Sequence, residues 1–327
     1  MKAYGVAPGK VILTGEHFVV EGAPALVAAI RMYSTVTAEL LSDSWTRIES
    51  KSLGYSGRFK GRKFELIQGG LNARRFLEPI HAISELARQG FHQERGLHIR
   101  IDSEIPVGVG LGSSAAIAVS TVAAVSKLLD REIDRDTIRD SVYRSEEMIH
   151  GTPSGIDQTV STYGGIIIYA RGKMIKHIRP RHPFSLIIGN TGKTRSTGIM
   201  VARVREQLNQ DMPFKKEVMK SILSISHQAV QAVETGDFKK LGQLMNSNHE
   251  LLQMIGASTV ELNRLVLAAR RAGALGAKMT GAGGGGCMAA LSQRGKEQRV
   301  SRAIKRAGGM PYNVSIDEGG VKAWLCG

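Results

Sequence analysis

The sequence predicts a two-domain α+β protein, and three features of the chain lead to this fold class. At 327 residues, the chain is longer than one typical domain. Short apolar segments typical of strands dominate its first part, whereas long helical patterns dominate beyond about residue 192. A glycine-rich turn also leads from a strand pattern into a helix near residue 112. We therefore expect an N-terminal mixed α/β domain at residues 1–185 and a C-terminal domain at residues 186–327.

The pattern of apolar residues places strands and helices along the first part of the chain. Residues 42–70 are polar, glycine-bearing and basic, which indicates either a solvated hairpin and loop or a rim that attracts phosphate. Strands are expected at residues 11–13, 25–30, 34–41, 96–105, 164–169 and 184–188, and helices at residues 72–89, 114–129 and 136–150.

Helical spacing dominates the second part, and a run of glycines precedes an apolar strand there. Helices are expected at residues 199–209, 214–235, 238–255, 260–272 and 296–307, and strands at residues 287–291 and 320–325.

The composition is that of an ordinary globular protein with a basic balance. Hydrophobic residues make up 42% of the chain and charged residues 22%. The net charge of +15 is compatible with nucleic acid, but an aromatic content of 5% is low for base stacking, and no nucleic-acid motif is present. The apolar runs are too short to span a membrane, and the two cysteines form no metal or disulfide pattern. We expect a cytoplasmic protein with neither a nucleic-acid nor a membrane partner.

The segment Pro106-Val-Gly-Val-Gly-Leu-Gly-Ser-Ser-Ala-Ala116 has the features of a phosphate-binding turn. Alternate glycines let a backbone approach a ligand closely, and Ser113 and Ser114 are favoured N-cap residues for the helix that follows. Free N–H groups and the dipole at a helix N-terminus attract anions. The alternative is a helix start that binds nothing. The residues we interpret as binding nucleotide phosphates are Pro106, Val107, Gly108, Val109, Gly110, Leu111, Gly112, Ser113, Ser114, Ala115 and Ala116.

Two other glycine motifs do not fit a nucleotide-binding pattern. Gly281, Gly283 and Gly286 match the dinucleotide spacing G-x-G-x-x-G, but we expect a helix before them and a strand after them, the reverse of the order that a dinucleotide site needs. Lys193 and Thr194 resemble the end of a P-loop, but too few residues separate the two preceding glycines.

Three charged residues are candidates for a site near the glycine-rich turn. Glu146 is expected on the flank of the apolar face of its helix, where a carboxylate is unusual unless it is paired or bound to a cation. It can be a ligand of Mg²⁺ or the partner of a basic side chain. Asp157 follows a proline and a glycine in an irregular turn, where it projects into a site or merely caps the next turn. Lys10, before the first strand, can be functional or simply exposed.

Three segments, taken in order, resemble the signature motifs of the GHMP kinases. They are Ala7-Pro-Gly-Lys-Val-Ile-Leu-Thr-Gly-Glu-His17, the glycine-rich segment at residues 106–116, and Lys278-Met-Thr-Gly-Ala-Gly-Gly-Gly-Gly-Cys287. Within that family, residues 15–26 and 150–165 are most similar to mevalonate kinases, and the short chain most resembles their archaeal members. The resemblance spans nearly the whole chain. It implies the two-domain GHMP kinase fold with a ferredoxin-like α/β C-terminal domain, and transfer of the ATP γ-phosphoryl group to the 5-hydroxyl of mevalonate.

The resemblance also implies roles for individual residues. Asp157 matches the catalytic aspartate of the family and Lys10 the lysine beside it, while Ser114 and Glu146 match ligands of Mg²⁺. His17 can equally be a structural histidine. The residues implied on the substrate side are Glu16, His17, Thr197, Gly281 and Ala282.

The partners expected are therefore ATP, mevalonate, Mg²⁺ and a second copy of the chain in a homodimer. The alternatives are a sister kinase acting on phosphomevalonate or a sugar alcohol, and a non-catalytic member that binds nucleotide.

Overall fold

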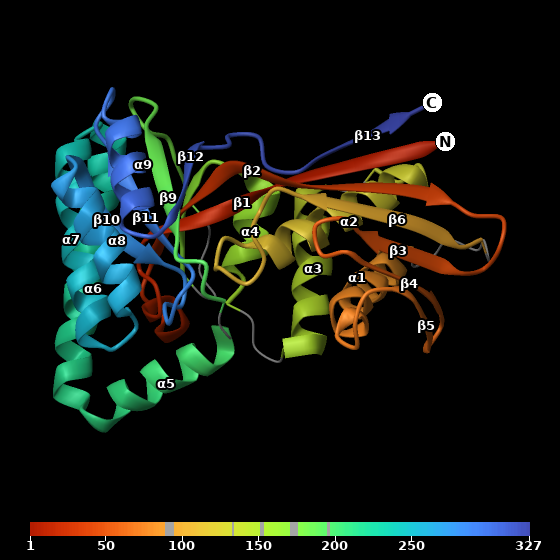
Figure 1. The fold of residues 1–327 in the computed structure, drawn as a ribbon, viewed down its shortest axis with the longest axis horizontal. Helices are drawn as coiled ribbons and strands as arrows, with labels where there is room; N and C mark the ends of the chain where they lie inside the picture. Colours follow the sequence, from red (N-terminus) through yellow and green to blue (C-terminus); the bar gives the residue numbers. More distant parts are fainter. Residues whose placement is uncertain (89–94, 133, 151–153, 171–175, 195–196) are drawn as a thin grey trace.

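Two β-sheets, each covered by helices on one face, make up the molecule (Figure 1). The computed structural model describes residues 1–88, 95–132, 134–150, 154–170, 176–194 and 197–327. Within these ranges one sheet has nine strands and the other four. The strand β9 (Ser185–Asn190) is the first of the smaller sheet. The division of the chain at residues 185 and 186 stays a prediction.

The larger sheet is built around two long antiparallel strands, β1 (Lys2–Thr14) and β2 (Ala25–Leu40). The expectation of two strands, at residues 25–30 and 34–41, is wrong, because both belong to β2. The register shifts opposite Pro8 and Gly9, and such an irregularity interrupts the alternation of apolar and polar residues. The other strands of this sheet are β3 (Thr46–Ser50), β4 (Tyr55–Lys60), β5 (Lys63–Gln68), β6 (Leu97–Ser103), β7 (Ile166–Tyr169), β8 (Lys176–Ile178) and β13 (Lys322–Cys326).

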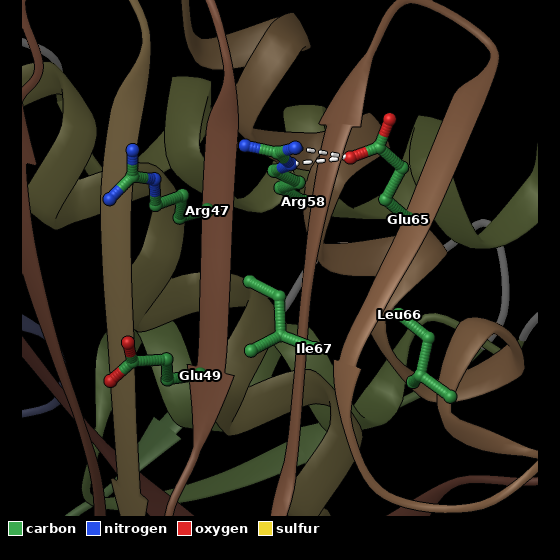
Figure 2. A pocket seen from close by; sticks show the side chains of 6 residues that line it. All are labelled: Arg47, Glu49, Arg58, Glu65, Leu66 and Ile67. Atoms are coloured by element: carbon green, nitrogen blue, oxygen red, sulfur yellow. Dashed lines mark hydrogen bonds and ion pairs between the residues drawn. The ribbon is translucent and has the colours of Figure 1, made fainter.

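The segment at residues 42–70 contains the expected hairpin, formed by β4 and β5, and a third strand, β3, where a loop was expected. The face of these strands that is turned away from the helices carries a shallow hollow of about 430 Å³ (Figure 2). The Arg58 guanidinium at its rim is paired with the Glu65 carboxylate, which Lys63 also contacts at 2.9 Å. The polar side chains of the outer face hide the apolar alternation that marks a strand in sequence.

In the described part of the chain, three helices pack on the opposite face of the larger sheet, and a fourth, α3 (Arg135–His150), packs on those helices (Figure 1). The apolar helix α2 (Ser113–Leu128) packs on β1 and β2, and it is buried nearly all round, as its composition predicted. It lies so close to β1 that a Cβ atom at Gly5 would come within 2.1 Å of the Ser120 carbonyl oxygen. The other two helices on the sheet are α1 (Ala73–Ala87) and α4 (Ile156–Tyr163).

The smaller sheet has the strand order β10-β11-β9-β12, and every neighbouring pair is antiparallel. This order is that of a ferredoxin-like domain, so the predicted two-domain α+β fold class is confirmed. Its further strands are β10 (Ala274–Thr280), β11 (Cys287–Ser292) and β12 (Met310–Ser315), and its helices are α5 (Thr197–Gln210), α6 (Met212–Thr235), α7 (Phe238–Met254), α8 (Val260–Arg271) and α9 (Glu297–Arg306).

Strand β10 lies directly before Gly281, between that glycine and the helix expected at residues 260–272, in a segment for which no strand was expected. The sequence pattern did not predict this strand because alanine and glycine, both weak strand formers, occupy much of it. Gly276 must be small, since a Cβ there would lie 2.0 Å from the Gly242 carbonyl oxygen on α7. Gly281–Gly286 therefore connects two antiparallel strands. That context also differs from a dinucleotide site, which needs a helix after the motif.

The two sheets meet at the C-terminal end of β1. There the Ile12 amide donates to Thr280 Oγ1 of β10 at 2.9 Å. No helix in the described part of the chain is long and apolar enough to cross a membrane.

Candidate active site

The glycine-rich loop is fixed against β1 at Lys10. The Lys10 amide donates to the Leu111 carbonyl oxygen at 2.9 Å. Gly112 has a positive φ of 78°, and a Cβ there would lie only 2.9 Å from Lys10 Cγ. Glycine is therefore required where the loop passes the lysine.

Helix α2 begins at Ser113, and its N-cap is Gly112 without a side-chain cap. The predicted serine N-cap is wrong because this position needs a left-handed backbone, which serine adopts poorly. The Ser114 side chain consequently stays exposed in the first turn of α2. Gly108 and Gly110 also have positive φ values, as expected for a loop that wraps a ligand.

Lys10 and Asp157 form an ion pair, with 3.0 Å between Lys10 Nζ and Asp157 Oδ1. Lys10 is buried, whereas the Asp157 side chain is 38% exposed, so the aspartate forms the accessible side of the pair. Asp157 lies in the first turn of α4 rather than in the irregular turn that the sequence indicated. The helix is anchored to β1 because Ser161 Oγ donates to the Pro8 carbonyl oxygen at 2.7 Å.

Gly155 explains how the chain turns into α4. It is the N-cap residue, with a φ of 82°, and a Cβ there would lie 2.3 Å from the Tyr169 hydroxyl oxygen. A bulkier residue would displace the first turn, and Asp157 with it.

Glu146 lies on α3 on the same side as the Lys10–Asp157 pair. Burial, and then the negative charge of Asp157, raise the pKa of Glu146 to about 7, while Lys10 acts in the opposite direction. Among the described residues, no lysine or arginine forms a salt bridge with Glu146. The site thus holds two neighbouring carboxylates and one ammonium, a donor set that favours a further cation.

Residues of the first and third motifs meet on the other side of the site. His17 Nε2 lies 2.9 Å from the Ala282 carbonyl oxygen. Gly281, beside it, has a positive φ of 78°. Thr197 begins α5, but its side chain lies outside the part of the structure that is described.

Glu16 is not turned toward the accessible part of the site. Its side chain is fully buried and forms an ion pair with Lys278 of β10, which is equally buried. The sequence placed Lys278 in the third motif without a role, although a lysine among small and apolar residues was a signal that could have been used.

A third loop completes the site from the C-terminal domain. The Gly286 amide donates to the Lys193 carbonyl oxygen at 2.9 Å, and Thr191 Oγ1 donates to the Gly286 carbonyl oxygen at 2.8 Å. Thr194 faces the glycine-rich loop, since a Cβ at Gly108 would be in ordinary contact with it at 3.5 Å. The segment that resembled the end of a P-loop is therefore a turn joined to the third motif.

Beneath this region, His249 is buried and neutral. Its Nδ1 atom accepts a hydrogen bond from the Met279 amide at 3.3 Å. Burial first, then the charges of Arg270 and Lys278, lower the pKa of His249 to about 3. Its ordinary value in an unfolded chain is about 6.5.

We expect this histidine to make folding sensitive to acid. Below pH 6.5, His249 is protonated in the unfolded chain but stays neutral in the folded protein. The free energy of unfolding therefore falls as the pH drops from about 6.5 toward 3. The contribution is at most about 1.4 kcal/mol per pH unit. In urea unfolding at pH 7.5, 6 and 5, the free energy of unfolding should fall less with decreasing pH for His249→Gln than for the parent protein. Substitution of the exposed His227, in His227→Gln, serves as the control. The same dependence of the unfolding free energy on pH in all three proteins would contradict the expectation.

Comparison with known proteins agrees with the geometry. The GHMP kinases N terminal domain profile matches residues 77–165, and the GHMP kinases C terminal profile matches residues 229–309. The chain is 41% identical to the mevalonate kinase of Pyrococcus abyssi, over 97% of this chain and 96% of that protein. It is 34% identical to the mevalonate kinase of Aeropyrum pernix, over 97% and 96% of the two chains.

Solved structures give the same result. The Methanococcus jannaschii mevalonate kinase superposes with a TM-score of 0.81 at 28% identity, covering 96% of this chain and 98% of that one. The L. major mevalonate kinase, solved in complex with R-mevalonate, gives a TM-score of 0.80 at 29% identity, covering 96% and 95%. With both family profiles matched in order and a relative 41% identical over nearly its full length, the chain belongs to the mevalonate kinases of the GHMP kinase family.

Proposed function

We propose that this kinase transfers the γ-phosphoryl group of ATP to the 5-hydroxyl of mevalonate, forming 5-phosphomevalonate and ADP in the mevalonate pathway of isoprenoid synthesis. The observation that carries the proposal is the Lys10–Asp157 ion pair, held directly against the glycine-rich loop. The pair lies where an alcohol activated by Asp157 could meet a phosphate held by the loop. Full-length similarity to mevalonate kinases supports mevalonate as the alcohol.

The chain's own residues would act mainly by positioning and by charge. Amides of residues 106–116 and the N-terminus of α2 would hold the phosphates. Asp157 would accept the proton of the attacking hydroxyl through its exposed carboxylate. Lys10, 3.0 Å away, would stabilise the negative charge that gathers on the transferred group and the attacking oxygen. His17 and Ala282 would line the alcohol side.

The donor set near Asp157 fits a hard divalent cation. Glu146 is half-buried close to a second carboxylate, and the Ser114 hydroxyl is exposed at the start of α2. Mg²⁺ prefers oxygen ligands and is commonly held by one or two protein groups together with nucleotide phosphates. Glu146 and Ser114 would hold it, and when bound it would neutralise phosphate charge.

Glu146→Gln should weaken metal binding without changing the fold. Glutamine keeps the size of the side chain but removes the charge that attracts a cation, so we expect the metal requirement to rise by about 10–100-fold. Binding of Mn²⁺ in the presence of ATP, followed by electron paramagnetic resonance, measures this independently of turnover. Glu147→Gln, one residue along the same helix, is the matched control. An unchanged Mn²⁺ affinity in Glu146→Gln would remove Glu146 from the metal site.

A panel of alcohols in a coupled assay of ADP release tests the proposed reaction. Mevalonate should be phosphorylated, whereas phosphomevalonate and galactose should give at most background rates. Preference for another alcohol would overturn the substrate, and ATP-independent nucleic-acid binding without turnover would favour a non-catalytic role. The homodimer stays a prediction.

A further inference from the structure

Lys278 is fully buried where the two sheets meet, a rare environment for a lysine. Its Nζ atom donates to Glu16 Oε1, to the Met279 carbonyl oxygen at 2.7 Å and to the Ile12 carbonyl oxygen at 3.4 Å. An ammonium group has three protons, so each of them has an acceptor here. Lys278 therefore joins β10 both to β1 and to the turn that follows β1.

Glu16 depends on this lysine for its charge balance. Its Oε1 atom is held by Lys278, whereas its buried Oε2 atom has no hydrogen-bond partner among the described residues. Burial raises the pKa of Glu16, while the charges of Lys278 and, to a smaller extent, Lys10 lower it. Lys10 thus lies within electrostatic range of three carboxylates, Asp157, Glu146 and Glu16.

The turn that carries Glu16 is also attached to the C-terminal domain by neutral hydrogen bonds. The Gly15 amide donates to Asn248 Oδ1 at 3.0 Å, and Thr14 Oγ1 lies 3.2 Å from Ser226 Oγ. These bonds involve no charge, so they can persist when Lys278 is altered. Loss of Lys278 would change the charge balance of the turn more than its attachment.

We propose that Lys278 is a positioning residue: by holding Glu16, it leaves Lys10 paired with Asp157. The inference rests on the proposed function, which gives that pair its role. Without Lys278, Glu16 is a buried carboxylate with two open acceptor atoms, and such a group draws in another cation or takes up a proton. Lys10 is then shared between Glu16 and Asp157, and the reacting hydroxyl loses its aligned partner.

Lys278→Met is expected to lower kcat by about 10²-fold, the typical cost of a small misplacement at a reacting centre. The KM for ATP should not change, because the glycine-rich loop contacts Lys10 through its backbone. Removing Glu16 as well should restore turnover: the double variant Glu16→Gln, Lys278→Met should reach within about tenfold of the parent, since removing both members of a buried pair costs far less than removing one.

A second comparison separates positioning from a purely structural role. In a Lys10→Met background, Lys278→Met should cause little further loss of kcat, because the effect acts through Lys10. If Lys278→Met instead caused a structural defect independent of Lys10, the fold-reductions in kcat of the two single variants would multiply in the double variant. Arg270→Met is the matched control: Arg270 also donates to carbonyl oxygens, those of Ala277 on β10 and Asn246 on α7, but neither acceptor belongs to β1 or to the turn that carries Glu16. It should keep the parent kcat.

Each outcome decides the inference. If Lys278→Met is not folded by circular dichroism, Lys278→Gln, which keeps a donor but no charge, takes its place. Equal losses in the folded single and double variants would overturn the proposal, and so would a near-parental kcat in Lys278→Met. A parent enzyme that prefers another alcohol would refute the proposed substrate only, because the same variants can be compared on that alcohol.

Discussion

Asp157→Asn is expected to lower kcat by about 10²–10⁴-fold, the usual contribution of a positioned general base. Asparagine has nearly the same shape and can still accept a hydrogen bond from Lys10, so the geometry around α4 should survive. It cannot take up the proton of the hydroxyl. Because the base acts in the transition state, kcat and kcat/KM should fall together while the KM for ATP is retained. Steady-state assays of ADP release measure these constants.

The control for this prediction is Asp102→Asn. Asp102 is also paired with a lysine, Lys51, at 3.1 Å, but that pair is exposed on the outer face of the larger sheet. Loss of an exposed pair costs little, so this variant should behave like the parent. If Asp157→Asn retained more than about a tenth of the parental kcat, the proton would leave by another route, since a positioned base contributes at least about 10²-fold.

The predictable part of the fold is the part with strong, regular patterns. The apolar helix α2 and the long helices α6 and α7 appear where their periodicity predicts them, to within a few residues. A hairpin was expected at residues 42–70, but the bounds of β3, β4 and β5 could not be predicted because their exposed outer face breaks the apolar alternation. Strand β10 was missed because glycine and alanine replace strand-forming residues where it packs against α7.

In the candidate site, too, the sequence predicts which residues are unusual but not how they are arranged. The sequence alone could suggest that Lys10, Glu146 and Asp157 matter, because charged residues in apolar or constrained surroundings are unusual. The Lys10–Asp157 distance could not be predicted, since it depends on how α4 docks on β1 through Ser161. The burial of Glu16 against Lys278 depends on contact between domains, which no local pattern encodes.

Lys10→Met is expected to lower kcat by about 10²–10³-fold, comparable with the loss of one preorganised charge-stabilising group at a reacting centre. Methionine fills the volume of the lysine stem, so the Leu111 carbonyl can still accept from the backbone amide at position 10. The ammonium is lost, and with it the cation that lies 3.0 Å from Asp157 and opposes the charge of Glu146. Lysine is needed rather than any polar residue, because the charge must reach a buried position between α2 and α4.

Lys51→Met is the matched control, because it removes the lysine of an exposed pair. Binding of a fluorescent ATP analogue should be similar in both variants and the parent, since the loop contacts residue 10 through its backbone. A large loss of nucleotide affinity with a normal kcat would mean that Lys10 holds the ground-state phosphates instead. Loss of kcat alone would place its charge in the transition state, where Lys10 and Asp157 act as one unit. The double variant should then lose little more than either single variant.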